Sequence, residues 1–212
     1  MVVLDPGHNG GNAANPEAIN RPVPAGRGRT KPCNTTGTAT NAGYPEHKFT
    51  WAVAQRVRDV LTAQGVKVIL TRPTDTGIGP CVNARAAAGN KAKATAVVSI
   101  HADGSTNPEA HGFHVAYSAP PLNAAQGEPS LRLARTMRDG MAKAGFPTST
   151  YIGSSGLSPR DDLGGLNLSE RPAVLVECGN MRNATEAAAF STQAGQDSYA
   201  KAIAAGVLTY LA

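Results

Sequence analysis

Two histidines and two glutamates stand at positions where they could do chemistry together. His8 and His101 each follow a short apolar run, Glu177 closes a third such run, and Glu46 lies in the first turn of a predicted helix. Two neutral imidazoles and one carboxylate form the ligand set of a catalytic zinc ion that keeps a fourth position for water. A carboxylate that does not bind the metal could take the proton from that water. The four residues therefore predict a zinc hydrolase, of a class without the His-Glu-x-x-His helix motif.

The apolar runs themselves predict the elements that position these residues. We interpret four of them as strands buried on both faces, because they are short, continuous and rich in β-branched residues. They are Val2–Asp5, Val66–Leu70, Ala96–Ile100 and Ala173–Glu177, and the alternating run 112–117 is an edge or mixed strand. Ligands of open α/β sheets bind at the carboxyl ends of the strands. We therefore expect His8, His101 and Glu177 to meet at one edge of the sheet.

Apolar residues at helical spacing separate these strands. The first such helix would have Pro45 at its first position and end before Gly65, which places Glu46 at the same edge of the sheet. Further helices are expected over 85–93, 130–144 and the C-terminal segment. This alternation predicts an α/β fold: a single domain spanning 1–212, with a twisted, mostly parallel sheet of about six strands flanked by helices.

Two stretches show no periodicity. Residues 9–44 are rich in Gly, Pro, Asn and Thr and carry several basic side chains, and residues 145–172 are rich in Gly and Ser. Long irregular segments inside a compact domain are usually functional or disordered. We expect 9–44 to be a basic insertion in the domain.

The composition of the chain limits which kinds of protein it can be and which partners it can bind. The 41% apolar content of the 212 residues fits a globular chain and not a disordered one. A net charge of +5 suits an anionic polymer, although simple solubility is the favoured explanation. Basic runs interleaved with aromatic residues are absent, so we exclude nucleic acid as a partner. We also expect no membrane span, because no apolar stretch approaches 18 residues.

The three cysteines show no zinc-finger spacing. Cys33 and Cys81 lie in Pro- and Asn-containing loops. Cys178 lies within a run predicted to be an apolar strand, which predicts a buried free thiol. A Cys33–Cys81 disulfide would contribute about 4 kcal/mol in the chain-entropy model and would require an oxidising compartment. The alternative is two free loop thiols.

Four motifs, in this order, make the chain resemble the zinc-dependent N-acetylmuramoyl-L-alanine amidases of the amidase-3 type. The opening Val-Val-Leu-Asp-Pro-Gly-His8 resembles the family's first strand and first metal ligand. Pro-Glu46-His-Lys resembles its second ligand, Ser-Ile-His101-Ala-Asp its third, and Ala-Val-Leu-Val-Glu177-Cys-Gly the strand with its catalytic glutamate. The resemblance covers nearly the whole chain.

The resemblance implies that His8, Glu46 and His101 hold one Zn²⁺ and that Glu177 is the general base and then the general acid. The substrate would be peptidoglycan or a muropeptide, cleaved at the amide between N-acetylmuramic acid and L-alanine, for wall remodelling, daughter-cell separation or fragment recycling. Arg160 would bind a substrate carboxylate or stabilise the oxyanion, the alternative being an ion pair with a neighbouring aspartate.

Some features depart from the family or fall outside the motifs. The stretch between His8 and Glu46 is longer than usual, and 145–172 is too short and Gly-rich for a helix that plugs the site, so we expect an open site. We expect the remaining histidines, His47, His111 and His114, to be surface or neighbouring groups, with His111 nearest to the cleft.

Two other functions remain as alternatives: a zinc carboxypeptidase or aminopeptidase acting on wall peptides, and a non-catalytic wall-binding protein on the same scaffold. The chain begins directly with a strand and shows no secretory signal, so it would be cytosolic or a mature fragment. The resemblance, the expected disulfide and the excess of Arg over Lys favour an exported periplasmic or wall protein of a high-G+C bacterium such as an actinobacterium, acting as a monomer.

Overall fold

A six-stranded sheet forms the centre of the molecule. The computed structural model describes residues 1–212. The strand order is β4-β1-β5-β8-β6-β7, and all neighbours are parallel except β6 and β8. The strands are β1 (Val2–Pro6), β4 (Val68–Leu70), β5 (Ala96–Asp103), β6 (His114–Ser118), β7 (Leu157–Arg160) and β8 (Ala173–Asn180). The predicted α/β class and the mostly parallel sheet are confirmed.

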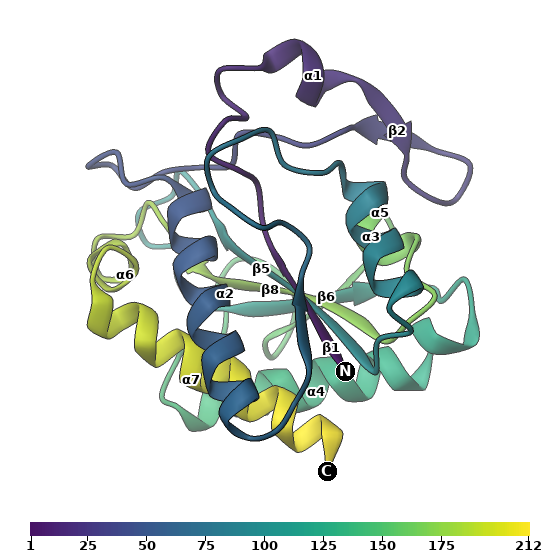
Figure 1. The fold of residues 1–212 in the computed structure, drawn as a ribbon. Coiled ribbons are helices and arrows are strands. Elements are labelled where there is room, and N and C mark those ends of the chain that lie inside the picture. The colour runs from purple at the N-terminus through teal and green to yellow at the C-terminus, as the bar shows by residue number, and fades with distance from the viewer.

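Helices cover both faces of this sheet (Figure 1). On one face lie α2 (Glu46–Ala63), α4 (Glu128–Lys143) and α7 (Gln193–Leu211), with α6 (Ala184–Phe190) packed on α7. On the other lie α3 (Val82–Lys91) and α5 (Gly164–Asn167). The larger apolar core joins the first face to its three long helices, and a smaller cluster that includes Leu166 lies under α5. Burial of both faces explains why the central strands are continuous apolar runs.

The helix α2 forms where the sequence predicts it. Phe49, Val53, Val57 and Leu61 recur every four residues, and all four are fully buried. Pro45 is the N-cap of α2 and not its first residue, because its backbone is still extended. This register makes Glu46 the first helical residue, at the carboxyl edge of the sheet.

Both irregular stretches contain regular elements that the sequence pattern did not indicate. Residues 9–44 form α1 (Pro16–Asn20) and an antiparallel hairpin of β2 (Pro22–Pro24) and β3 (Thr30–Pro32). Residues 145–172 contain the edge strand β7 and the short α5. In addition, β4 is shorter than predicted, while β5 and β8 run three residues further than predicted.

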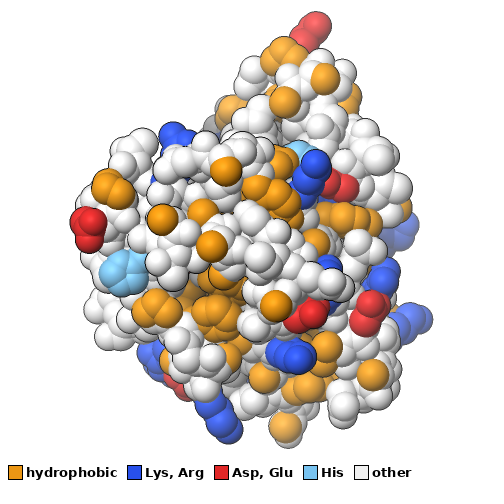
Figure 2. All heavy atoms as spheres, turned by 90° about the vertical axis from the view of Figure 1, so that its left-hand side faces the viewer, with side chains coloured by type: hydrophobic (Ala, Val, Ile, Leu, Met, Phe, Trp, Pro, Cys, Tyr) orange, Lys and Arg blue, Asp and Glu red, His pale blue; other side chains and the backbone are white.

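The segment 9–44 lies over the carboxyl edge of the sheet (Figure 1). The part with α1 projects at the top of the molecule in Figure 2, where acidic and basic side chains are interspersed over the visible face. The predicted disulfide between Cys33 and Cys81 joins the segment to the start of α3, and Cys178 is a buried free thiol. From β3, the Lys31 ammonium donates to the Asp162 carbonyl at 2.7 Å. None of the helices is long and apolar enough to cross a membrane.

Candidate metal centre

Three of the predicted residues converge at the carboxyl edge. His8 follows β1, Glu46 begins α2, and His101 lies on β5. The Glu46 carboxylate lies between the two imidazoles: Oε2 is 3.1 Å from Nε2 of His8, and Oε1 is 3.0 Å from Nδ1 of His101. One ligand atom from each residue lies within 4.8 Å of the others. The spacing is that of donors arranged around a single ion.

A close backbone approach makes this convergence possible. A Cβ on Gly7 would lie 2.3 Å from Cε1 of His101, so only glycine lets the chain pass the ring. A Cβ on Gly37, at φ +77°, would lie 2.8 Å from both Oε2 of Glu46 and Cδ2 of His8. These two glycines allow the end of β1 and the insertion to close around the cluster.

The insertion contacts two of the three residues from outside. Nδ1 of His8 lies 3.1 Å from the Thr35 carbonyl, which leaves Nε2 facing Glu46. The Thr38 backbone N–H donates to Oε2 of Glu46 at 2.9 Å. A histidine that binds a metal usually donates its other ring N–H to an oxygen in this way, which sets its tautomer and orientation.

A buried arginine supports His8 from beneath. His8 has a left-handed backbone (φ +58°), which is uncommon for a residue other than glycine. Arg85 of α3 donates to the His8 carbonyl at 2.8 Å, to the Pro6 carbonyl at 2.7 Å and to Oδ1 of Asp5 at 2.9 Å. Arg85 could not be recognised from the sequence, because nothing in the linear pattern relates α3 to the end of β1.

Electrostatics in the cluster favour an ionised carboxylate. Burial alone would raise the pKa of Glu46, but the adjacent His8 and His101 hold it well below its usual range. Burial likewise acts to lower the pKa of His8, and the Glu46 charge outweighs it and raises that pKa. An anionic carboxylate between two imidazoles has the donor chemistry that Zn²⁺ prefers, so the residues present fit the metal.

Glu177 lies beside this cluster on the same face of the sheet. It is the register partner of His101 across β5 and β8. Its Oε2 is buried and has no hydrogen-bond partner in the protein. Burial, Glu46 and Asp103 together raise its pKa well above the ordinary value, against the opposing effect of Arg160. A carboxylate with unused acceptor capacity and a raised pKa suits proton transfer better than a structural role.

The structure places Arg160 at the end of β7, in an ion pair. Its guanidinium makes two 2.7 Å hydrogen bonds to the Asp162 carboxylate. These bonds raise the pKa of Arg160, and Glu177 adds to the effect. Of the roles considered for Arg160, the structure therefore shows the ion pair with a neighbouring aspartate. The pair lies close enough to Glu177 for the two charges to interact.

The expectation that His111 is the remaining histidine nearest to the cleft is wrong. His111 bonds locally to the Glu109 carbonyl, whereas His114 is fully buried in β6 as the register partner of Glu177. His47 pairs with Asp75 at 2.7 Å beside Glu46. His114 begins an apolar strand, so the sequence did carry a signal for it. That strand runs antiparallel to β8, and its first residue therefore lies where the parallel strands β1, β5 and β8 end.

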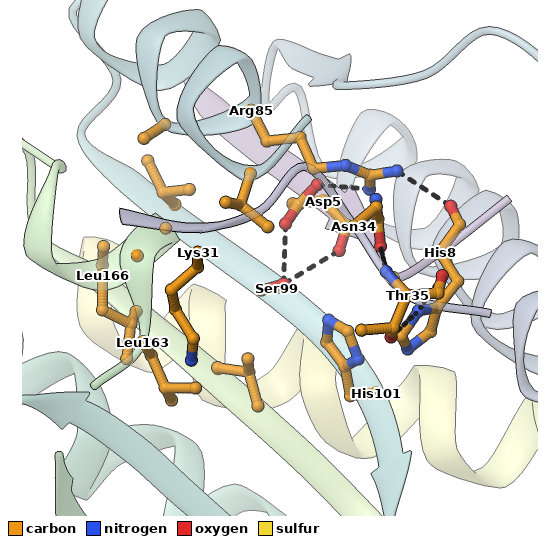
Figure 3. A pocket seen from close by; sticks show the side chains of 18 of the residues that line it. Asp5, His8, Lys31, Asn34, Thr35, Arg85, Ser99, His101, Leu163 and Leu166 are labelled. Carbon is orange, nitrogen blue, oxygen red and sulfur yellow. Dashed lines mark hydrogen bonds and ion pairs between the residues drawn. The ribbon is translucent and has the colours of Figure 1, made fainter. Parts of the chain in front are cut away.

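A cavity of about 200 Å³ opens next to His8 and His101 (Figure 3). One end is polar, where Asp5 bonds to Arg85 and Ser99. The other end is apolar and includes Leu163 and Leu166, with the Lys31 side chain extending along it. The cavity borders two members of the metal cluster but reaches neither Glu46 nor Glu177.

Comparisons with known proteins agree on one family. The model of the Amidase_3 family, described as N-acetylmuramoyl-L-alanine amidase, matches residues 2–209. The N-acetylmuramoyl-L-alanine amidase Rv3717 of Mycobacterium tuberculosis is 50% identical over 212 residues, which are 100% of this chain and 86% of the relative. The crystal structure of the amidase Ami1 from Mycobacterium smegmatis superimposes with a TM-score of 0.96 at 53% identity, covering 99% of this chain and 95% of that one. Ami1 from Mycobacterium abscessus gives the same score and identity, over 100% and 98%.

Proposed function

The chain belongs to the Amidase_3 family and is an N-acetylmuramoyl-L-alanine amidase, and we propose that it works with one zinc ion held by His8, Glu46 and His101. The observation that carries this proposal is the convergence of three donor atoms within 4.8 Å from three separate elements. The unpartnered carboxylate of Glu177 on the adjacent strand supports it. When bound there, zinc would polarise the substrate carbonyl and lower the pKa of water to about 7.

The residues of the chain then account for the proton transfers. Glu177 takes a proton from the attacking water, whose oxygen bonds to the carbonyl carbon of the amide. The same carboxyl delivers that proton to the amide nitrogen as the carbon–nitrogen bond breaks. The products are the carboxylic acid of the muramyl lactyl group and a stem peptide with a free L-alanine amine. The raised pKa of Glu177 makes its carboxylate a stronger base and so favours the first transfer, in which it takes the proton from water.

The setting of the reaction follows from the same features. We place the enzyme outside the cytoplasm, because the Cys33–Cys81 disulfide persists in oxidising compartments. Its substrate there would be peptidoglycan or soluble muropeptides, and it would act as a monomer. Sedimentation at micromolar concentration would test the monomeric state.

Digestion of a defined muramyl peptide, analysed by mass spectrometry, tests the proposed function. Zinc-loaded wild type should release the intact stem peptide, and chelation should abolish the release. Glu177→Gln should bind zinc normally and lose about 100- to 10,000-fold in kcat. Glu128→Gln, an exposed glutamate on α4, is the matched control and should behave as wild type. Cleavage that persists after chelation, or cleavage by Glu177→Gln at the wild-type rate, would refute the proposed zinc mechanism.

A further inference from the structure

His114 continues a row of side chains that begins at the metal cluster. Glu177 on β8 is paired in register with His101 on one side and with His114 on the other. Side chains of directly opposed residues project from the same face of a sheet, with Cβ atoms about 5 Å apart. The row His101–Glu177–His114 therefore crosses three adjacent strands, and His114 lies on the side of Glu177 away from the metal cluster.

Two members of this row, Glu177 and His114, lack the partners that buried polar atoms require. His114 is 1% exposed, and its Nδ1 has no hydrogen-bond partner in the protein. Oε2 of Glu177 is equally buried and equally unpartnered. A buried polar atom left without a partner costs about 1–3 kcal/mol. The two atoms are not hydrogen-bonded to each other in this structure, so a rotation of one side chain is needed to bring them together. Their chemistry is complementary if Nδ1 carries the proton.

The surroundings keep the imidazole neutral and oriented. Burial lowers the pKa of His114 to about 4, with Asp103 opposing the shift and Arg160 adding to it. The Tyr151 ring meets the imidazole edge to face, with centroids 6.4 Å apart and planes at 89°. A neutral imidazole has one N–H donor, and a ring fixed by packing presents it in one direction.

We propose that His114 is a positioning residue, whose Nδ1–H donates a hydrogen bond to Oε2 of Glu177 and so directs the exchanged proton to Oε1. The inference rests on the proposed role of Glu177 as base and acid. With Oε2 engaged, the carboxylate cannot rotate freely, and Oε1 alone remains to take the proton from water and return it to the leaving nitrogen. His114 itself gains and loses no proton in the cycle.

The other groups that face Glu177 do not supply this bond. Glu46 from α2 and Asp103 from β5 are acidic and act on it only through their charge. Arg160 from β7 is the single nearby cation, and its Nε and one terminal nitrogen donate to Asp162. The Tyr151 hydroxyl is a further buried donor without a partner, but burial and then Asp103 raise its pKa more than Glu177 does. His114 is the neutral donor that lies directly opposite Glu177 in the sheet.

Three substitutions at His114 test the proposal kinetically. An asparagine amide nitrogen can occupy the position of Nδ1, a glutamine amide reaches the position of Nε2, and leucine has no donor. We expect His114→Leu and His114→Gln to lose about 10- to 100-fold in kcat with KM nearly unchanged, and His114→Asn to recover most of the loss. Zinc affinity should be unchanged in all three, and His111→Leu is the matched control. Equal kcat in the asparagine and glutamine variants would overturn the proposal.

A second measurement does not depend on activity or on a folded leucine variant. Long-range ¹H–¹⁵N spectra of the wild-type protein should show His114 as the Nδ1–H tautomer at neutral pH, assigned with His114→Gln. Glu177→Ala should shift that Nδ1 resonance. An Nε2–H tautomer, or a His114 signal insensitive to Glu177→Ala, would overturn the proposal even if the wild type is an active amidase. Conversely, an inactive wild type with the expected tautomer would refute the proposed function and not the hydrogen bond.

Discussion

Replacing Arg85 with methionine should destabilise the protein and disturb the end of β1. Arg85 is 4% exposed, and its guanidinium makes hydrogen bonds of 2.7–2.9 Å to the Asp5 carboxylate and to the carbonyls of Pro6, His8 and Pro80. Methionine keeps most of the apolar stem and removes every donor. Breaking a buried ion pair from one side costs about 3–5 kcal/mol, because the remaining charge stays buried without a partner.

The size of this effect should depend on pH in a defined direction. Burial would raise the pKa of Asp5, but Arg85, Thr71 and Ser99 lower it. The stabilisation that ionised Asp5 contributes is therefore complete above its pKa in the unfolded chain, about 3.9. It is lost as the pH falls through the lower pKa of Asp5 in the folded protein. In Arg85→Met the pKa of Asp5 rises, so acid protonates the carboxyl and removes the uncompensated charge. The difference in unfolding free energy between wild type and variant should shrink from pH 7 to pH 4.

Urea denaturation at pH 7, 5 and 4 measures this difference directly. At pH 7 we expect a loss of about 4 kcal/mol and a melting temperature about 10 °C lower. Arg58→Met is the matched control: Arg58 pairs with Asp59 on the surface of α2, where an ion pair is worth about 0–1 kcal/mol. A loss under 1 kcal/mol, or one that stays constant between pH 7 and pH 4, would show that Arg85 does not stabilise the protein through Asp5.

Three further perturbations have expected outcomes. Replacing Cys33 and Cys81 with serine should lower the unfolding free energy by about 4 kcal/mol, measured by urea denaturation under non-reducing conditions; a loss below 1 kcal/mol would contradict the chain-entropy account. Because the folded pKa of His114 is about 4, only the unfolded chain binds its proton between pH 6.5 and 4, so stability should fall by about 3 kcal/mol over that window, and His114→Gln should remove this component. Zinc at 100 times its Kd should raise the unfolding free energy by about 2.7 kcal/mol, and an equal gain in Glu46→Gln would exclude that residue as a ligand.

The convergence at the carboxyl edge could be predicted because the relevant information is local. His8, His101 and Glu177 each end an apolar run, and parallel strands bring such ends to one edge of a sheet. Glu46 could be placed because a helix that follows the first strand begins at the same edge. Strand type and helix register were sufficient for all four residues.

What could not be predicted depends on contacts between distant segments. The edge strand β7 contains Pro159 and has few apolar residues, so no periodicity marks it. Arg85 looks like one polar residue of an Ala-rich helix until α3 is packed against β1. His114 was misplaced for a related reason: in the antiparallel β6 the strand's first residue, and not its last, lies at the functional edge.

The insertion 9–44 is better understood as part of the metal centre than as an appendage to it. Its Thr35 carbonyl faces the outer nitrogen of His8, and its Thr38 N–H bonds to Glu46, so two of the three proposed ligands take their orientation from this segment. Ordering a residue of irregular backbone costs about 1–2 kcal/mol of conformational entropy, so the segment needs fixed points to keep these contacts in place. Cys33 lies two residues before Thr35, and its disulfide to Cys81 fixes that point to the start of α3. From the same helix, Arg85 holds the His8 backbone. Both ends of the His8 contact are therefore anchored to α3, which makes this short helix the common support of the site.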